Sequence, residues 1–157
     1  MTRGPSRREF LLTAGGVAAG IGLASVGAIA PARATPAAMQ EAIRKVVGSA
    51  RVNTGRVKLE LPPLSENGNA VPLAVTVESP MTEADHVRAI HVFTEKNPQP
   101  DVVSVHLGPR AGRASVATRI RLADTQTVVA VCELSDGSFW SGRADVVVTL
   151  AACLEDA

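Results

Sequence analysis

The sequence predicts an all-β protein, an immunoglobulin-like antiparallel β-sandwich of about seven strands with one short N-terminal helix. From Arg56 onward, apolar and polar residues alternate with a period of two, as in strands that bury one face. The runs are rich in β-branched residues, and Gly, Pro, Asn or Asp interrupts them about every eight to twelve residues. A small antiparallel barrel is the alternative architecture.

One amphipathic helix is expected before the strands, at residues 36–49. Met39, Ile43, Val46 and Val47 share the spacing i, i+4, i+7, i+8, which places them on one helical face. Gly48 is a suitable residue to end the helix.

Seven strands follow, separated by segments of turn-forming residues. We expect them at residues 57–61, 71–78, 87–95, 102–107, 114–122, 127–134 and 144–150. The last two form a hairpin around a nine-residue loop that contains Phe139 and Trp140. The expected organisation is a leader (1–34), a helix and linker (35–55), a sandwich (56–150) and a C-terminal tail (151–157).

The leader resembles a bacterial twin-arginine export signal. Arg7 and Arg8 precede an apolar stretch at residues 11–30, and small residues up to Ala34 fit a cleavage site. An uncleaved membrane anchor is the alternative, and the five glycines in the stretch argue against it. We therefore expect cleavage after Ala34, a periplasmic location and no stable membrane association afterwards.

Composition excludes several classes of function. The leader holds four of the 16 Lys and Arg residues and one of the 15 Asp and Glu residues, so cleavage changes the net charge from +1 to −2. This charge, with 3% aromatic residues and no Tyr, argues against a nucleic-acid partner. No phosphate-binding glycine loop and no nucleophile elbow is present. We expect no cofactor, and export of the folded protein then points to a partner subunit.

Two cysteines are present, and they have different expected roles. Cys153 lies in the tail, where three extended residues beyond the last expected strand place it roughly 10 Å from the sandwich. Cys132 lies within an expected strand, on the face that carries Val128, Ala130 and Leu134, and is interpreted as a small buried hydrophobe. The expected hairpin puts Cys132 opposite residue 146, on the order of 20 Å from Cys153, which disfavours a disulfide. An idle terminal thiol is the alternative for Cys153.

The histidines offer one candidate metal site. His91 and His106 face each other if their strands pair symmetrically between residues 98 and 99, and two imidazoles across a ladder could begin a metal site. A solvated cross-strand pair is favoured, because no third ligand is evident, and we expect no metal. His86 is expected on the opposite face from His91.

The chain from about residue 38 to residue 150 resembles SoxY, the sulfur carrier family of the bacterial thiosulfate-oxidation (Sox) system. The likeness is spread over 57–62 (VKLELP), 66–72 (ENGNAVP), 79–87 (SPMTEADHV), 95–98 (EKNP), 118–122 (TRIRL) and 133–140 (ELSDGSFW). Together these segments are more specific than any single short motif. The twin-arginine leader also fits this family.

The resemblance implies a non-catalytic subunit that forms a heterodimer with SoxZ, a second β-sandwich protein. Its cysteine near the C-terminus, Cys153 here, would hold thiosulfate-derived sulfur covalently. A haem enzyme would join thiosulfate to that sulfur, and a manganese-dependent hydrolase would then release sulfate. The protein would be a carried substrate and not an enzyme.

The tail departs from the family pattern. SoxY proteins typically end in Gly-Gly-Cys-Gly-Gly, whereas this chain ends in Ala-Ala-Cys-Leu-Glu-Asp-Ala. Ala151 and Ala152 restrict the backbone, and Glu155 and Asp156 place negative charge near the thiol. Two alternatives follow: a SoxY-like binding or structural subunit that carries no sulfur, and an enzyme that uses the histidine pair and a metal.

Overall fold

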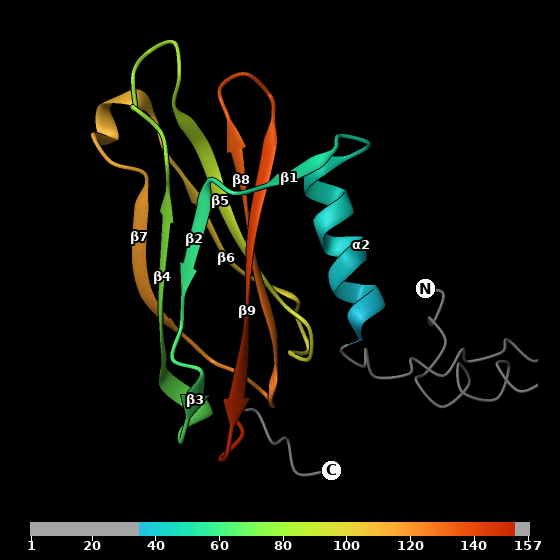
Figure 1. The fold of residues 1–157 in the computed structure, drawn as a ribbon. Helices are drawn as coiled ribbons and strands as arrows, with labels where there is room; N and C mark the ends of the chain where they lie inside the picture. The colour runs from blue at the N-terminus through green and yellow to red at the C-terminus, as the bar shows by residue number, and fades with distance from the viewer. Residues whose placement is uncertain (1–34, 153–157) are drawn as a thin grey trace, which may run out of the picture. The chain divides into compact units, whose positions relative to one another are not determined.

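The computed structural model describes residues 35–152. Arg7, Arg8, Ala34 and Cys153 lie outside this range. The described chain forms two β-sheets that share one hydrophobic core, with a single α-helix beside the larger sheet (Figure 1). The expected β-sandwich is confirmed, and the barrel alternative is wrong because the sheets stay separate.

The sheets contain nine strands within the described residues. The larger sheet has the order β1 (Val52–Thr54), β9 (Phe139–Val148), β8 (Gln126–Leu134), β5 (Val87–Thr94) and β6 (Asp101–His106), with β3 (Leu64–Ser65) also paired to β9. The smaller sheet has the order β2 (Val57–Glu60), β4 (Val71–Val77) and β7 (Ser115–Ile120). Two 3-10 turns complete the fold, η1 (Gly68–Ala70) and η2 (Pro109–Ala111).

Two strands, β1 and β3, were not predicted. Both pair in parallel with β9, β1 at its start and β3 at its end, while β2 joins the other sheet between them. The chain crosses close to Gly142 of β9, where a Cβ atom would lie only 2.6 Å from the Val57 carbonyl oxygen. Strands of two or three residues are too short to show a periodic pattern, so they became visible only through their pairing.

The last hairpin is tighter than expected. β9 begins at Phe139, so a four-residue turn replaces the expected nine-residue loop. Gly137, with φ of 81°, donates its N–H to the Leu134 carbonyl at 3.0 Å. Cys132 therefore pairs with Trp140 and not with residue 146. The register prediction was wrong because the Asp136-Gly137 turn closes the hairpin early.

The register of β5 and β6 also differs from the prediction. His91 lies opposite Ser104, and His106 lies opposite Ala89, so the two histidines are diagonal neighbours. The pairing starts with Phe93 opposite Asp101, so the turn is centred near residue 97 and not between residues 98 and 99. An irregularity between Val92 and Phe93 then changes the register by one residue. Bulges of this kind depend on contacts across the sheet and leave no alternating pattern to read.

The main core fills the space between the two sheets. Its largest fully buried aliphatic side chains include Ile90, Leu122, Val75, Val92 and Val128. The burial pattern of β4 alternates strictly, which is the signature of a strand with one buried face. The core therefore follows the period-two pattern of the sequence.

The helix α2 (Pro36–Val47) covers part of the outer face of the larger sheet (Figure 1). The Thr35 side chain accepts a hydrogen bond from the Ala38 N–H, Pro36 occupies the first turn, and Gly48 ends the helix with φ of 61°. A second, smaller core joins the helix to the sheet through Met39, Val47, Phe93, Val131 and Phe139. Within residues 35–152, no helix is long and apolar enough to cross a membrane.

Candidate functional site

The chain segment after β9 is tied to the sandwich. Thr149 donates its N–H to the Ser65 carbonyl at 3.1 Å, and the Leu150 carbonyl accepts from the Gly68 N–H at 2.8 Å. Ala152 donates to the Leu122 carbonyl at 3.0 Å and is 1% exposed. The expected free arm beginning after residue 150 was therefore wrong, since the chain is held as far as Ala152.

Gly68, Leu122 and Ala152, here called the tail clamp, meet through their backbones. Gly68 accepts from the Leu122 N–H at 2.8 Å, and Leu122 in turn accepts from Ala152. A Cβ atom at Gly68 would lie 2.5 Å from the Leu122 oxygen and 2.8 Å from the Ala152 nitrogen. Only glycine allows this approach without a shift of the backbone.

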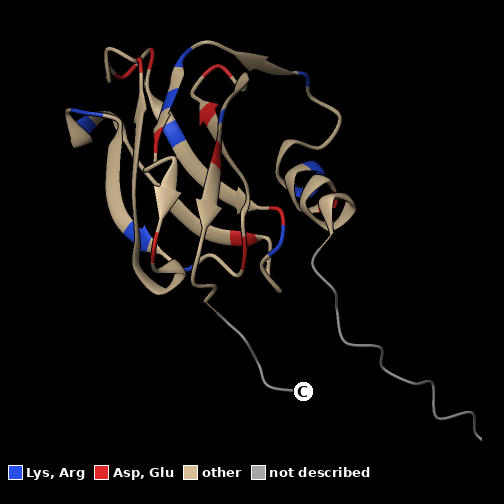
Figure 2. Ribbon diagram, turned by 60° about the horizontal axis from the view of Figure 1, so that its bottom comes forward, with Lys and Arg blue, Asp and Glu red and all other residues tan. Residues whose placement is uncertain are grey.

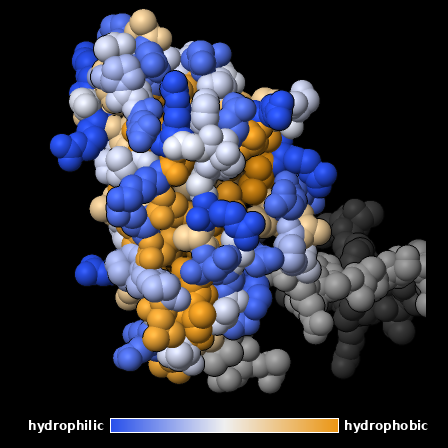
Figure 3. Space-filling model, in the orientation of Figure 1, coloured by the Kyte–Doolittle hydropathy of each residue, from blue (hydrophilic) through white to orange (hydrophobic). Residues whose placement is uncertain are grey.

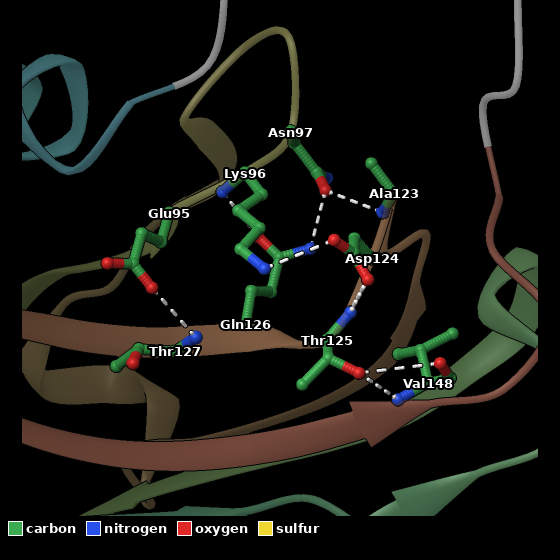
Figure 4. Close-up of polar contacts among 9 residues, drawn as sticks. All are labelled: Glu95, Lys96, Asn97, Ala123, Asp124, Thr125, Gln126, Thr127 and Val148. Atoms are coloured by element: carbon green, nitrogen blue, oxygen red, sulfur yellow. Dashed lines mark hydrogen bonds and ion pairs between the residues drawn. The ribbon is translucent and has the colours of Figure 1, made fainter.

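A buried amide network holds the segment that contains Leu122 (Figure 4). Asn97 donates its Nδ2 hydrogen to the Arg121 carbonyl at 2.7 Å, and its Oδ1 accepts from the Ala123 N–H at 2.9 Å. Gln126 Nε2 also donates to Asn97 Oδ1, at 2.9 Å. Asn97 and Gln126 are both buried. The amide of Asn97 thus brackets Leu122 on both sides and fixes one member of the tail clamp.

The segment that follows Leu122 also holds the end of β9. Val148 donates its N–H to Thr125 Oγ1 at 3.0 Å, and Thr125 donates its own N–H to Asp124 Oδ1 (Figure 4). Lys96 Nζ lies 3.1 Å from Asp124 Oδ2, and this hydrogen bond lowers the pKa of Asp124. The last strand and the tail are therefore positioned by one polar cluster.

An exposed apolar patch lies beside the tail clamp. It consists of Leu64, Val147 and Leu150, which are 53%, 49% and 59% exposed and are the large hydrophobic side chains exposed within residues 35–152. Leu64 and Val147 occupy paired positions of β3 and β9. The space-filling view shows an apolar area at this end of the molecule (Figure 3). Apolar residues gathered in this way are typical of a contact surface for other proteins.

Cys132 is fully buried in the main core beside Val128, Ala130 and Leu134, as predicted. Burial raises the pKa of the Cys132 thiol to about 11. Because the thiolate is the reactive form, this thiol is a poor nucleophile at neutral pH.

The histidines do not assemble a metal site. His91 Nδ1 lies 2.9 Å from Ser104 Oγ, which donates to Asp101 Oδ1 at 3.2 Å, and burial lowers the pKa of His91. The His106 ring is 6.0 Å from the His91 ring, edge to face. His86 lies before β5, with Nδ1 3.0 Å from the Thr82 carbonyl. In the described part of the chain, no group of three His, Cys, Asp or Glu side chains could hold a metal ion.

Sequence reasoning missed the tail clamp and the amide network. Asn67-Gly68-Asn69 and Asn97 fall between the strands expected from the sequence, in segments of turn-forming residues. The sequence signal for the tail clamp was a glycine between two turn-forming asparagines. The residues that Gly68 contacts lie more than 50 positions away in the sequence. Such contacts arise only when the two sheets pack together.

The fold and the clamp define a class of protein: an immunoglobulin-like β-sandwich module whose C-terminal segment is fixed as far as residue 152. A family model described as "Sulfur oxidation protein SoxY" matches residues 43–153, which is most of the chain. The chain belongs to the SoxY family. The predicted resemblance is confirmed.

Solved structures agree with this assignment. The sulfur carrier protein SoxY from Chlorobium limicola f thiosulfatophilum is similar, with a TM-score of 0.61, 28% identity and coverage of 73% of this chain and 98% of that chain. A superoxide reductase (neelaredoxin) from Ignicoccus hospitalis has a TM-score of 0.56 at 16% identity, covering 62% and 94% of the two chains. This second likeness shows the fold alone. Among curated proteins, no relative matches the chain.

Membership in this family also bears on whether the chain is an enzyme. SoxY proteins are sulfur carrier subunits of the Sox system and not catalytic enzymes. The prediction of a non-catalytic subunit is therefore confirmed, and the enzyme alternative is set aside.

Proposed function

We propose that the chain is a periplasmic sulfur carrier that holds thiosulfate-derived intermediates covalently on Cys153. In this proposal residues 1–34 direct export through the twin-arginine pathway and are removed after Ala34. The mature protein pairs with a SoxZ-like β-sandwich subunit. Haem-containing and manganese-dependent Sox enzymes then act on the sulfur it carries.

The choice of Cys153 is supported by the contrast between the two cysteines. Cys132 is buried among aliphatic side chains, and its raised pKa leaves almost no thiolate at neutral pH. Only Cys153 is left to carry sulfur, and the SoxY family match extends to this residue.

The observation that carries the proposal is the anchoring of Ala152. The residue before Cys153 is buried and bonded to Leu122, so the chain reaches the cysteine from a fixed point. Covalent geometry then keeps the Cys153 sulfur within about 7 Å of the Ala152 Cα. An enzyme that uses this thiol must approach closely. The exposed apolar patch of Leu64, Val147 and Leu150 lies beside the anchored segment and is proposed as its contact surface.

The proposed loading step is an oxidation. The Cys153 thiolate and the terminal sulfur of thiosulfate form an S–S bond, the thiol proton goes to solvent, and two electrons pass to the haem enzyme. Water then releases sulfate in the hydrolase. Glu155 and Asp156 add negative charge near the thiol and repel the thiosulfate anion, so loading is expected to be slower than on a glycine tail.

Intact-protein mass spectrometry tests the proposal directly. The mature protein is isolated without reductant from cells oxidising thiosulfate, beside Cys153→Ser and Cys132→Ala variants. We expect mass gains that match sulfane sulfur or a thiosulfonate, reversed by reductant, in the wild type and Cys132→Ala. An unmodified Cys153 in a protein that still binds its partner would support the alternative, a SoxY-like non-carrier binding subunit.

A further inference from the structure

One side of the sandwich carries a concentration of unpaired positive charge. Residues 102–123 contain four arginines and no Asp or Glu, although the chain without its leader has a net charge of −2. The four are exposed, and none forms an ion pair among the described residues: Arg110, Arg113, Arg119 and Arg121. Figure 2 shows basic segments at both ends of β7.

The same side presents two open strand edges. Within residues 35–152, β7 pairs only with β4, and β6 pairs only with β5. A groove of about 550 Å³ lies between these edges. It is lined by residues 97–99 and Asp101, Val102 and Val103 on the β6 side, and by residues 118–121 of the β7 segment. Asp101 is the one acidic residue of this lining, beside two arginines. Open edges can accept a further strand from another chain.

The pairing of β7 with β4 shows which backbone groups face outward. Pro72 has no N–H and lies opposite Arg119, so this position cannot be a mutually hydrogen-bonded pair. Hydrogen-bonded pairs alternate in an antiparallel ladder, so Ser115, Ala117 and Arg119 direct their N–H groups toward the open edge. β7 therefore offers three free donors in regular spacing.

Charge complementarity selects the occupant of this edge. A second copy of the chain would bring like-charged arginine clusters together, which opposes self-pairing. A partner strand with Asp or Glu side chains gains both the backbone hydrogen bonds and the ion pairs. The apolar patch lies at β3 and the end of β9, which belong to the other sheet from β7.

We propose that the edge of β7, with Arg119 and Arg121 and the adjoining β6–β7 groove, is the docking surface for the β-sandwich partner subunit. The partner adds an edge strand alongside Ser115–Ile120 and places acidic side chains against the arginines. This inference rests on the proposed function, because it assigns a surface to the partner subunit named there. Leu122 of the tail clamp follows Arg121 directly, so the docked partner lies near the C-terminal tail.

The test uses the mature chain and the SoxZ subunit of the same organism. Their dissociation constant is measured at low and high salt for the wild type, an Arg119→Glu/Arg121→Glu variant, Ala117→Pro, and Arg143→Glu as a charge-reversal control on β9. We expect each β7 variant to bind at least tenfold more weakly, and the charge variant to lose most of the salt dependence. Arg143→Glu should bind as the wild type does. Circular dichroism and thermal unfolding verify that each variant is folded.

Two results would overturn the docking surface. The first is wild-type affinity in both folded β7 variants. The second is self-association of the charge variant with SoxZ binding retained, which would mean that the arginines only protect the edge. Cys153→Ser is included because it cannot carry sulfur but should bind SoxZ normally. Failure of the carrier proposal is thus distinguished from failure of the docking surface.

Discussion

Gly68 shows how a single residue can anchor the C-terminal segment of the chain. Its missing side chain lets the backbones of η1, Leu122 and Ala152 approach within hydrogen-bond distance. The contact fixes the C-terminal segment immediately before Cys153. The point from which the chain continues to Cys153 is therefore fixed by a glycine 84 positions before Ala152.

Replacing Gly68 by Ala should loosen this anchor. The new Cβ atom would meet the Leu122 oxygen and the Ala152 nitrogen, so the backbone must move apart. We expect a loss of about 1–3 kcal/mol in the free energy of unfolding, measured by urea denaturation, and faster amide exchange at Ala152. Asn69→Ala, at the exposed next position of η1, is the control. Unchanged exchange at Ala152 in Gly68→Ala would contradict the anchoring role.

The stability of the protein at alkaline pH should depend on Cys132. Its pKa rises from 9.0 to about 11 on burial, so the folded state keeps its proton where the unfolded state has lost it. Stability should therefore be unaffected below pH 9 and should fall between pH 9 and 11, by up to about 2 kcal/mol. Denaturation at several pH values should show this fall in the wild type and not in Cys132→Ala. Parallel pH profiles for the two proteins would refute it.

At the scale of elements, each long segment folds as its own pattern predicts. α2 has its predicted apolar face and ends at the predicted glycine. Six of the seven expected strands lie within two residues of their predicted bounds, and β9 begins five residues earlier than expected. The errors concern how elements meet: the registers of β5 with β6 and of β8 with β9, and the short strands β1 and β3. Turns centred elsewhere than expected and two brief parallel pairings cause these differences, and none of them changes the local periodicity.

The loop between β5 and β6 also holds a distant segment. Asn97→Ala removes three hydrogen bonds, to Arg121, Ala123 and Gln126, and leaves the buried Gln126 amide without that partner. We expect a loss of about 2–4 kcal/mol in chemical denaturation, because buried polar groups become unsatisfied. Gln99→Ala, at an exposed position of the same loop, should change stability by less than about 0.5 kcal/mol. Equal effects of the two substitutions would contradict a structural role for the amide network.

At the scale of the whole molecule, the surface of the sandwich has three distinct regions. The β7 edge is assigned to the partner subunit, the apolar patch lies beside the tail clamp, and α2 covers another part of the larger sheet. In the proposed function, the partner subunit and the approaching enzyme use different surfaces of the sandwich. A carrier with these separate surfaces can visit several enzymes without exchanging its partner.

Export of the whole precursor should depend on the paired arginines of the leader. Arg7→Lys together with Arg8→Lys removes the paired arginines and keeps the charge of the leader. We expect the double variant to remain in the cytoplasm as the uncleaved precursor, whereas the wild type appears in the periplasm with Thr35 as its first residue. Arg3→Lys with Arg33→Lys is the charge-matched control and should be exported normally. Fractionation with intact mass measurement distinguishes these outcomes, and wild-type export of the double variant would refute the leader assignment.

The sequence by itself determined the all-β class, the helix, the seven long strands, the burial of Cys132 and membership of the SoxY family. These features depend on local periodicity and on motifs within short segments, which a single chain displays directly. Only the tertiary structure decided the strand registers, the tail clamp and the basic edge of β7. Each of these depends on contacts between residues far apart in sequence. Their geometry is set by close contacts between backbone segments and by turns and bulges, which leave no periodic pattern in the sequence.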